Sequence, residues 1–170
     1  MAIKRYFATK DNTITNAFKS NLSTRGTGSN MGQADVLEVF SILGQASSSV
    51  GLSSELARVL IEFDTSDISS DRTAGSIPAS GSVSFYLKMY NAKHGQTLPK
   101  SYTMEVKAIT GSNGTREWNE GLGLDMENYS DEDASNWISA SEGTAWTTEG
   151  GDYIIDNSSS FTASFDTGFE

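Results

Sequence analysis

Strict alternation of apolar and polar side chains is the feature that most constrains this chain. The segment 83–90 has the sequence VSFYLKMY, and the segment 102–108 has the sequence YTMEVKA. Successive side chains of a strand point to opposite faces, so each segment presents one apolar face and one polar face. This pattern predicts half-buried strands in an antiparallel sheet with one face in water.

The segments before residue 50 carry weaker strand signals. Lys4–Ala8 and Thr13–Phe18 are predicted to form a first short pair around the turn-like residues 10–12. Residues 20–33 are rich in Ser, Thr, Asn and Gly and predict a long loop. Val36–Leu43 is apolar on both faces except at Glu38 and Ser41, as expected of a central strand.

The segment Ala57–Phe63 admits two interpretations. Ser54 is placed to cap a helix that begins at Glu55. The β-branched residues Val59 and Ile61 instead favour a strand that ends at Phe63, and we prefer the strand.

The remaining elements follow from turn and capping signals. Asn113-Gly114 predicts a hairpin turn. Ser130 followed by three acidic residues predicts a helix at about 130–140, with Trp137 on its inner face. Tyr153–Ile155 and Phe161–Phe165 are predicted to be short closing strands.

Together these elements predict an all-β protein. About eight short strands, frequent turns and one short helix are typical of an antiparallel β-sandwich, here of jelly-roll type. The length of 170 residues suits a single domain, 1–170.

The region Arg116–Tyr153 combines large indoles with many acidic groups. It holds all three tryptophans, Trp118, Trp137 and Trp146, and no basic residue follows Arg116. The chain carries 12 basic and 9 acidic residues up to Arg116, and 13 acidic and no basic residues after it. We expect the indoles to face inward and the carboxylates to face outward, because exposed indoles and buried unpaired acids both cost free energy.

Composition argues against several classes of function. There is no cysteine, which excludes disulfides, thiolate metal sites and cysteine nucleophiles. Basic residues are thinly spread in an acidic chain, so no nucleic-acid partner is expected. No run of apolar residues is long enough to cross a membrane, and the first residues do not form a signal peptide.

No catalytic constellation emerges from the sequence. The single histidine, His94, lies in a loop with no acidic cluster beside it in the sequence. Residues 26–32 contain three glycines but lack the lysine that ends a phosphate-binding loop. We therefore expect no enzymatic activity, no catalytic residue and no required cofactor.

Two binding sites remain as alternatives. The acidic residues of one loop region have the oxygen ligands that calcium prefers, although their spacing does not fit an EF-hand and helix capping explains some of them: Asp125, Glu127, Asp131, Glu132 and Asp133. Trp118, Trp137 and Trp146 are candidates for stacking on sugar rings, but we favour a place for them in the core.

Several short motifs resemble those of the DNRLRE-type domain, a β-sandwich of bacterial surface proteins and phage virion proteins. The segment Arg58–Ser66 (RVLIEFDTS) is similar to the family's R-x-L-I-x-F-D-x-S strand. Ser82–Tyr90 resembles its A-x-L-x-L-Y strand, and Trp118–Gly121 (WNEG) resembles W-x-E-G. Trp146–Gly151 (WTTEGG) is similar to W-x-x-P-G-G, with Glu149 in place of the proline.

The start of the chain extends the resemblance. Asp11–Ala17 and Asn30-Met31-Gly32 follow the family's order, and Tyr6–Gly32 is similar to the beginning of virion or fibre-like proteins of tailed marine phages. The family usually adds a strand pair beyond the position of Glu170. The resemblance therefore implies either the N-terminal domain of a longer protein or a strand supplied by a partner.

The resemblance implies a non-enzymatic virion structural protein. Its place would be in capsid decoration, the neck or tail, or the anchoring of a fibre, after assembly in the host cytoplasm. Its partners would be other virion subunits in a homo-oligomeric or symmetric array, with charge complementarity setting their orientation. The alternative is a carbohydrate-binding module that recognises a glycan on the host surface.

Overall fold

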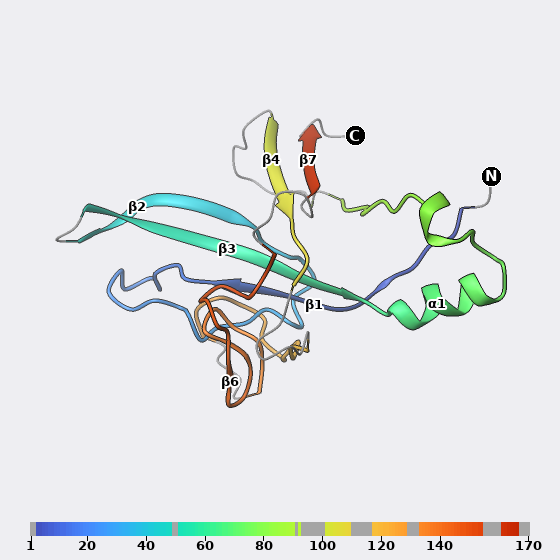
Figure 1. The fold of residues 1–170 in the computed structure, drawn as a ribbon. Coiled ribbons are helices and arrows are strands. Elements are labelled where there is room, and N and C mark those ends of the chain that lie inside the picture. The colour runs from blue at the N-terminus through green and yellow to red at the C-terminus, as the bar shows by residue number, and fades with distance from the viewer. Residues whose placement is uncertain are drawn as a thin grey trace.

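The computed structural model describes residues 3–48, 51–90, 92, 101–109, 117–128, 133–154 and 161–166. Figure 1 shows the chain as a set of strands with one α-helix. The elements, in chain order, are β1 (Ala8–Thr15), β2 (Phe40–Ser48), β3 (Gly51–Phe63), α1 (Thr65–Thr73), the 3-10 turn η1 (Ser80–Ser82), β4 (Ser101–Val106), β5 (Ser139–Ser141), β6 (Thr144–Ala145) and β7 (Phe161–Asp166).

The largest sheet has three antiparallel strands in the order β1-β3-β2. Asn12 lies opposite Leu60, and Ala57 lies opposite Thr15 on one side and Phe40 on the other. The far halves of β2 and β3 extend together beyond the rest of the chain as a two-stranded arm (Figure 1). We call this part of the hairpin the β2–β3 arm.

The other two sheets each have two strands. β4 pairs with β7 in antiparallel register, from Ser101 opposite Asp166 to Val106 opposite Phe161. β5 and β6 form a short hairpin whose turn contains Gly143. The described chain is thus mostly antiparallel β-structure with one short helix, which confirms the all-β class. Its sheets are small and open.

Two predicted strands are confirmed, a third is confirmed in part, and others are corrected. Ala57–Phe63 lies within β3, and Phe161–Phe165 lies within β7. The strand predicted at 102–108 is found over residues 102–106, because β4 ends at Val106. The predicted break at residues 10–12 is wrong, because β1 runs through them without interruption. Asn12 is fully buried and is held by hydrogen bonds from its side chain, so its polarity does not signal a turn.

Two further strand predictions differ from the structure. Val36–Leu43 was expected in the centre of a sheet, but β2 begins at Phe40 and lies at the edge, while β3 takes the centre. Val83–Tyr90 belongs to no sheet, although its side chains alternate. Tyr153 forms only an isolated bridge with Ile109, and Ile155 and the Asn113-Gly114 turn lie outside the described residues.

The helix predicted at about 130–140 is wrong over its described part. Residues 133–138 form bends and irregular structure and Ser139–Ser141 form β5, while residues 130–132 lie outside the described residues. The side chain of Asn136 accepts hydrogen bonds from the backbone N–H groups of Ile138 and Ser139, each at 2.8 Å. Such local bonds compete with helix formation.

The α-helix lies instead at Thr65–Thr73, directly after β3. Asp64 caps it, because its carboxylate accepts a hydrogen bond from the N–H of Ser66 at 2.8 Å. None of its described residues is buried. The N-terminal segment lies against it, since Lys4 and Tyr6 both donate hydrogen bonds to the carboxylate of Asp71.

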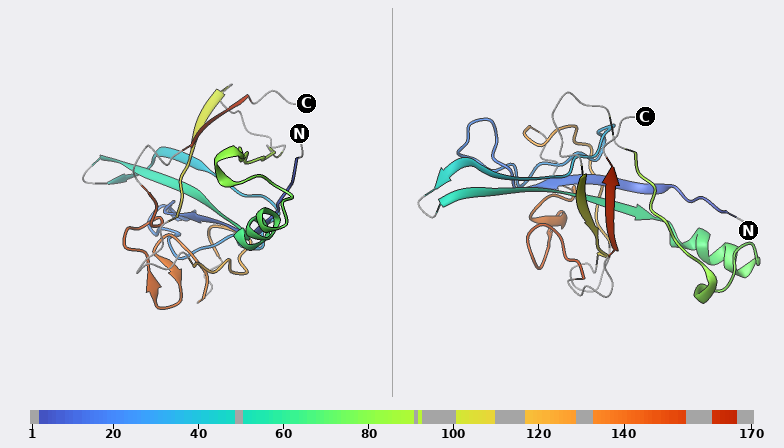
Figure 2. Two further views of the ribbon diagram at one scale, coloured as in Figure 1. Left: turned by 45° about the vertical axis from the view of Figure 1, so that its right-hand side comes forward. Right: turned by 90° about the horizontal axis from the view of Figure 1, so that it is seen from above.

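The core forms where the acidic second half of the chain packs against β1 and β3. Its buried members are Ile14, Leu60, Trp118, Trp137, Ala140 and Trp146. The part of the chain from 133 to 154 lies below β3 in the view of Figure 1, and the segment 83–90 lies at the α1 end of the molecule, near the N-terminal segment (Figures 1 and 2). None of the described helices has the length and hydrophobicity needed to span a membrane.

Candidate functional site

An open groove of about 670 Å³ lies between the start of β1 and the segment after Trp118. Its described lining residues are Thr9, Lys10, Asn119, Glu120, Gly121, Leu122 and Asp133. It is a shallow opening on the surface and not an enclosed pocket. The groove thus lies between the polar start of β1 and the WNEG motif at Trp118–Gly121.

Close backbone contacts hold the segment 119–123, part of which lines the groove. A Cβ atom on Gly32 would lie 2.1 Å from the carbonyl oxygen of Glu120. A Cβ atom on Gly123 would lie at the same distance from the carbonyl oxygen of Asn30. Only glycine fits such approaches. The two motifs Asn30-Met31-Gly32 and Trp118–Gly121, which are about 90 residues apart in the sequence, are therefore in direct contact.

A buried hydrogen-bond network supports this contact. The amide nitrogen of Asn12 donates to the carbonyl and hydroxyl oxygens of Ser135, at 2.9 and 2.8 Å. Its amide oxygen accepts from the N–H of Met31 at 2.8 Å. Asn30 accepts from the N–H of Gly123 at 2.7 Å. Buried polar groups are stable when their bonds are satisfied, so this network fixes the loops around the groove.

The charged residues of the groove are held in fixed places. Glu120 accepts a hydrogen bond from the backbone N–H of Asp11 at 2.7 Å. Lys10 forms an ion pair with Glu62 at 3.2 Å. Burial raises the pKa of the Asp11 carboxyl above its ordinary value, and the nearby charge of Glu120 raises it further.

Asp133 completes the acidic side of the groove. It accepts a hydrogen bond from the side-chain amide of Asn119 at 2.8 Å and from the N–H of Glu142 at 3.2 Å. The charge of Lys10 is balanced by Glu62, so Glu120 and Asp133 leave the groove net acidic. Leu122, 62% exposed, adds an apolar contact surface. The arrangement suits a partner that brings a cation and an apolar or aromatic group.

All three tryptophans lie in the core, as the preferred interpretation predicts. Trp118, Trp137 and Trp146 are 2%, 4% and 6% exposed. The indole N–H of Trp146 donates to the carbonyl oxygen of Asn136 at 2.8 Å. Arg58 lies over the ring of Trp137, 4.9 Å from its centroid. The indoles are engaged by the fold and present no open face for a sugar ring.

The acidic residues proposed for calcium have local roles where the structure describes them. Asp125 accepts hydrogen bonds from the N–H groups of Glu127 and Asn128, at 2.8 and 2.6 Å. Glu127 accepts from the hydroxyl and N–H of Ser20. Asp131 and Glu132 lie outside the described residues. Within the described residues, no three His, Cys, Asp or Glu side chains cluster as a metal site would require.

Of the two remaining candidates from the sequence, one lies outside the described residues and the other is buried in the fold. His94 lies outside the described residues. The glycine-containing loop at 26–32 is not free, because Ser29, Asn30 and Met31 are buried. Trp137 also donates its backbone N–H to the carbonyl oxygen of Thr27 at 3.0 Å. This loop is a packed structural element.

Sequence reasoning did not identify the groove itself. Its lining comes from residues 9–10, 119–122 and 133, and no spacing rule connects these segments. The WNEG motif was the one available signal, since Asn119, Glu120 and Gly121 all line the groove.

Comparison with known proteins adds no assignment. The chain matches no known family, and no curated protein or solved structure is significantly similar to it. The resemblance to the DNRLRE-type domain therefore stays a prediction.

Proposed function

We propose that this protein is a non-enzymatic structural subunit of a phage virion, which acts through contacts with other subunits. Such a subunit decorates the capsid, forms part of the neck or tail, or anchors a fibre. The observation that carries the proposal is an exposed aromatic segment. Phe85, Tyr86 and Tyr90 are 58%, 89% and 82% exposed, and Phe7 is 83% exposed. Exposed groups of large apolar side chains mark interaction sites more often than plain surface.

The open sheets support the same proposal. β2 lies at one edge of its sheet and extends into the β2–β3 arm. Leu43 on β2 is 71% exposed. Proteins seldom leave a long edge strand bare, because such an edge pairs readily with another chain. We propose that the chain is a jelly-roll-type sandwich whose edges are covered by neighbouring subunits in the particle.

A mass-spectrometric inventory of purified virions tests this function. The chain is expected in the particles at a fixed ratio to the major capsid protein. Its presence in the cell lysate but not in washed virions would contradict the proposal. Persistent attachment in high salt would also contradict a charge-based contact, because screening weakens exposed ion pairs.

The carbohydrate-binding alternative receives less support. It depended on exposed indoles, and the three tryptophans are at most 6% exposed. A glycan array with the purified chain is expected to give no specific signal. Specific binding to one glycan class would favour the alternative over the assembly function.

A further inference from the structure

The segment Val83–Tyr90 has the form of a strand without a sheet. Tyr86, Lys88 and Tyr90 occupy alternate positions and are exposed, while Val83 and Met89 are half-buried. No backbone hydrogen bond between this segment and another described segment is present. The sequence alternates, but both faces are exposed from Ser84 to Lys88, and the described chain supplies no neighbouring strand.

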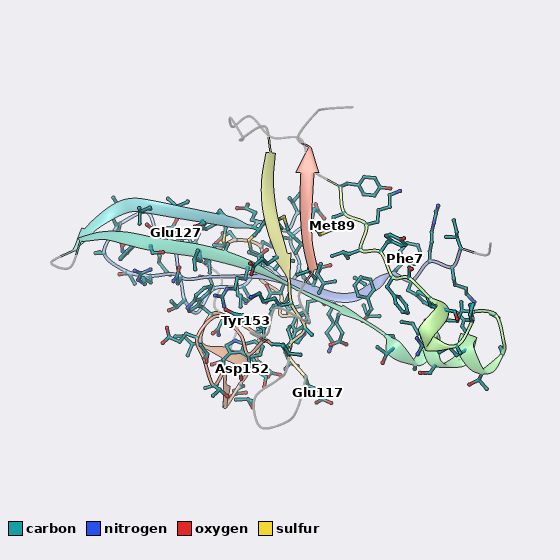
Figure 3. All side chains as sticks on the ribbon, turned by 45° about the horizontal axis from the view of Figure 1, so that its top comes forward. Phe7, Met89, Glu117, Glu127, Asp152 and Tyr153 are labelled. Atoms are coloured by element: carbon teal, nitrogen blue, oxygen red, sulfur yellow. The ribbon has the colours of Figure 1, made fainter. Side chains whose placement is uncertain are left out.

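This segment is basic as well as aromatic. It contains Lys88 and no acidic residue. The ammonium group of Lys88 lies 5.0 Å from the centre of the Tyr90 ring. Tyr90 also lies within electrostatic range of Arg5. Figure 3 shows Met89 and Phe7 in the same part of the molecule, well away from Glu117. We name the exposed residues at these alternate positions the aromatic patch: Tyr86, Lys88 and Tyr90.

The groove has the complementary chemistry. Glu120 and Asp133 leave it net acidic, and Leu122 gives it an apolar surface. It is open to solvent, so bulky side chains of a partner can reach its lining residues. Buried aromatic anchors that fill pockets carry most of the energy of protein interfaces, and charge pairs set their orientation.

Within one copy, the segment 83–90 contributes none of the described residues that line the groove. The segment 83–90 lies above the level of β3 in Figure 1, and the region that follows residue 117 lies below it. In the structure the segment does not fill the groove, so the groove is open to the same segment of a second copy.

We propose that the aromatic patch of one copy docks into the groove of the next, with Tyr86 and Tyr90 as anchors and Lys88 beside Asp133 and Glu120. The inference rests on the proposed assembly function and names a second copy of this chain as the partner. Each copy uses two different surfaces, so the contact is heterologous and produces a ring or an open filament.

Sedimentation velocity of the purified chain tests the contact. Wild-type protein is expected to form dimers and longer species as concentration rises, and to dissociate in high salt. Tyr86→Ala is expected to weaken association at least about tenfold without changing the melting temperature, because Tyr86 is 89% exposed. Val36→Ala, which alters a 47% exposed residue outside both surfaces and outside β2, is the matched control and is expected to associate normally.

A charge exchange tests the pairing directly. Lys88→Glu and Asp133→Lys are each expected to abolish self-association, because like charges would then meet. An equimolar mixture of the two variants is expected to associate again. In an assembly in which the two variants alternate, each aromatic patch meets a groove of opposite charge. Asp133→Asn keeps a hydrogen-bond acceptor for Asn119 and is expected to weaken association with the fold intact. Glu149→Lys makes the same charge change at an exposed site outside the groove and is expected to have no effect.

Specific outcomes would overturn the inference. A wild-type chain that stays monomeric at high concentration excludes this contact. Association that survives both Lys88→Glu and Asp133→Lys, or that is lost equally in Glu149→Lys, places the contact elsewhere. A monomeric chain found in virions would overturn this inference alone. A self-associating chain absent from virions would overturn the proposed function alone.

Discussion

Arg58 donates a hydrogen bond to the carbonyl oxygen of Gly150 at 2.6 Å, across 92 residues of sequence. The guanidinium lies between two aromatic rings, 4.9 Å from the centre of Trp137 and 5.0 Å from that of Tyr153. Gly150 has a φ of +87°, and a Cβ there would lie 2.5 Å from the guanidinium of Arg58. The central strand β3 is thus joined to the turn after Trp146 by one side chain.

Replacing Arg58 is expected to loosen the core. Arg58→Ala removes a charged hydrogen bond and two cation–π contacts, and we expect it to lower the free energy of unfolding by about 3 kcal/mol. Arg58→Lys keeps the charge but lacks the planar group that stacks, so an intermediate loss is expected. Urea unfolding followed by circular dichroism measures both values. Equal stability of Arg58→Ala and wild type would show that the contact contributes nothing.

Gly32 is expected to be intolerant of any side chain. Gly32→Ala would place its Cβ 2.1 Å from the Glu120 carbonyl oxygen, and backbone atoms cannot move aside easily. We expect a loss of about 3 kcal/mol or more in the free energy of unfolding. Gly81→Ala is the matched control, because nothing lies within 4 Å of its Cβ position, and we expect a change within about 0.5 kcal/mol. Similar melting temperatures for the two variants would contradict the close contact.

The stability of the fold is expected to depend on the ionisation of Asp152. Burial by itself raises the pKa of Asp152, but hydrogen bonds from the backbone N–H groups of Thr147 and Thr148 and from the Thr147 side chain outweigh it. The pKa in the folded state is therefore below its ordinary value. Such a carboxyl stabilises the fold above its unfolded pKa of about 3.9, and this contribution is lost as the pH falls through the lowered pKa.

Urea unfolding of wild type and Asp152→Asn, at pH 7 and at steps down to pH 3, measures this contribution. We expect the variant to be less stable at pH 7 and the difference between the two proteins to shrink in acid. Other carboxyls with lowered pKa, such as those of Asp64 and Asp71, are common to both proteins and cancel in the difference. A constant difference across the range would show that the ionisation of Asp152 does not matter.

The fluorescence of the folded chain is expected to be that of buried indoles. Trp118, Trp137 and Trp146 are all at most 6% exposed, so acrylamide should quench them weakly until urea unfolds the chain. Added glycans should leave the emission unchanged. Strong quenching of the folded protein would contradict the core and revive the sugar-binding alternative.

The elements predicted correctly are those that β-branched or alternating residues define locally. Val59 and Ile61 favoured the strand that became β3, and the alternation at 102–106 became β4. The same reasoning placed 83–90 in a sheet, because alternation reports which side chains share a face but not whether a neighbouring strand exists. The jelly-roll arrangement stays a prediction, since the described sheets are small and open.

Errors arose where polar residues have partners far away in the sequence. Asn12 was taken as part of a turn, yet it lies inside β1 and bonds to Ser135. The acidic run at 131–133 was taken as a helix cap, whereas the side chain of Asn136 directs the chain into turns. The groove was missed for the same reason, because its residues are brought together only by contacts such as Gly32 with Glu120.

The position of β1 also determines when the chain can fold. This strand is made first, but Asn12 and Asp11 bond to residues 123 and 109 positions later. Closing such long loops is entropically costly and slows folding, and the first strands remain uncovered until most of the chain has been made. A ribosome-bound chain that lacks residues beyond 117 would have β1 and β3 without their tryptophans. Protease resistance should therefore appear only after the residues around Trp146 have left the ribosome, and the nascent chain before that point should be an aggregation-prone client of chaperones.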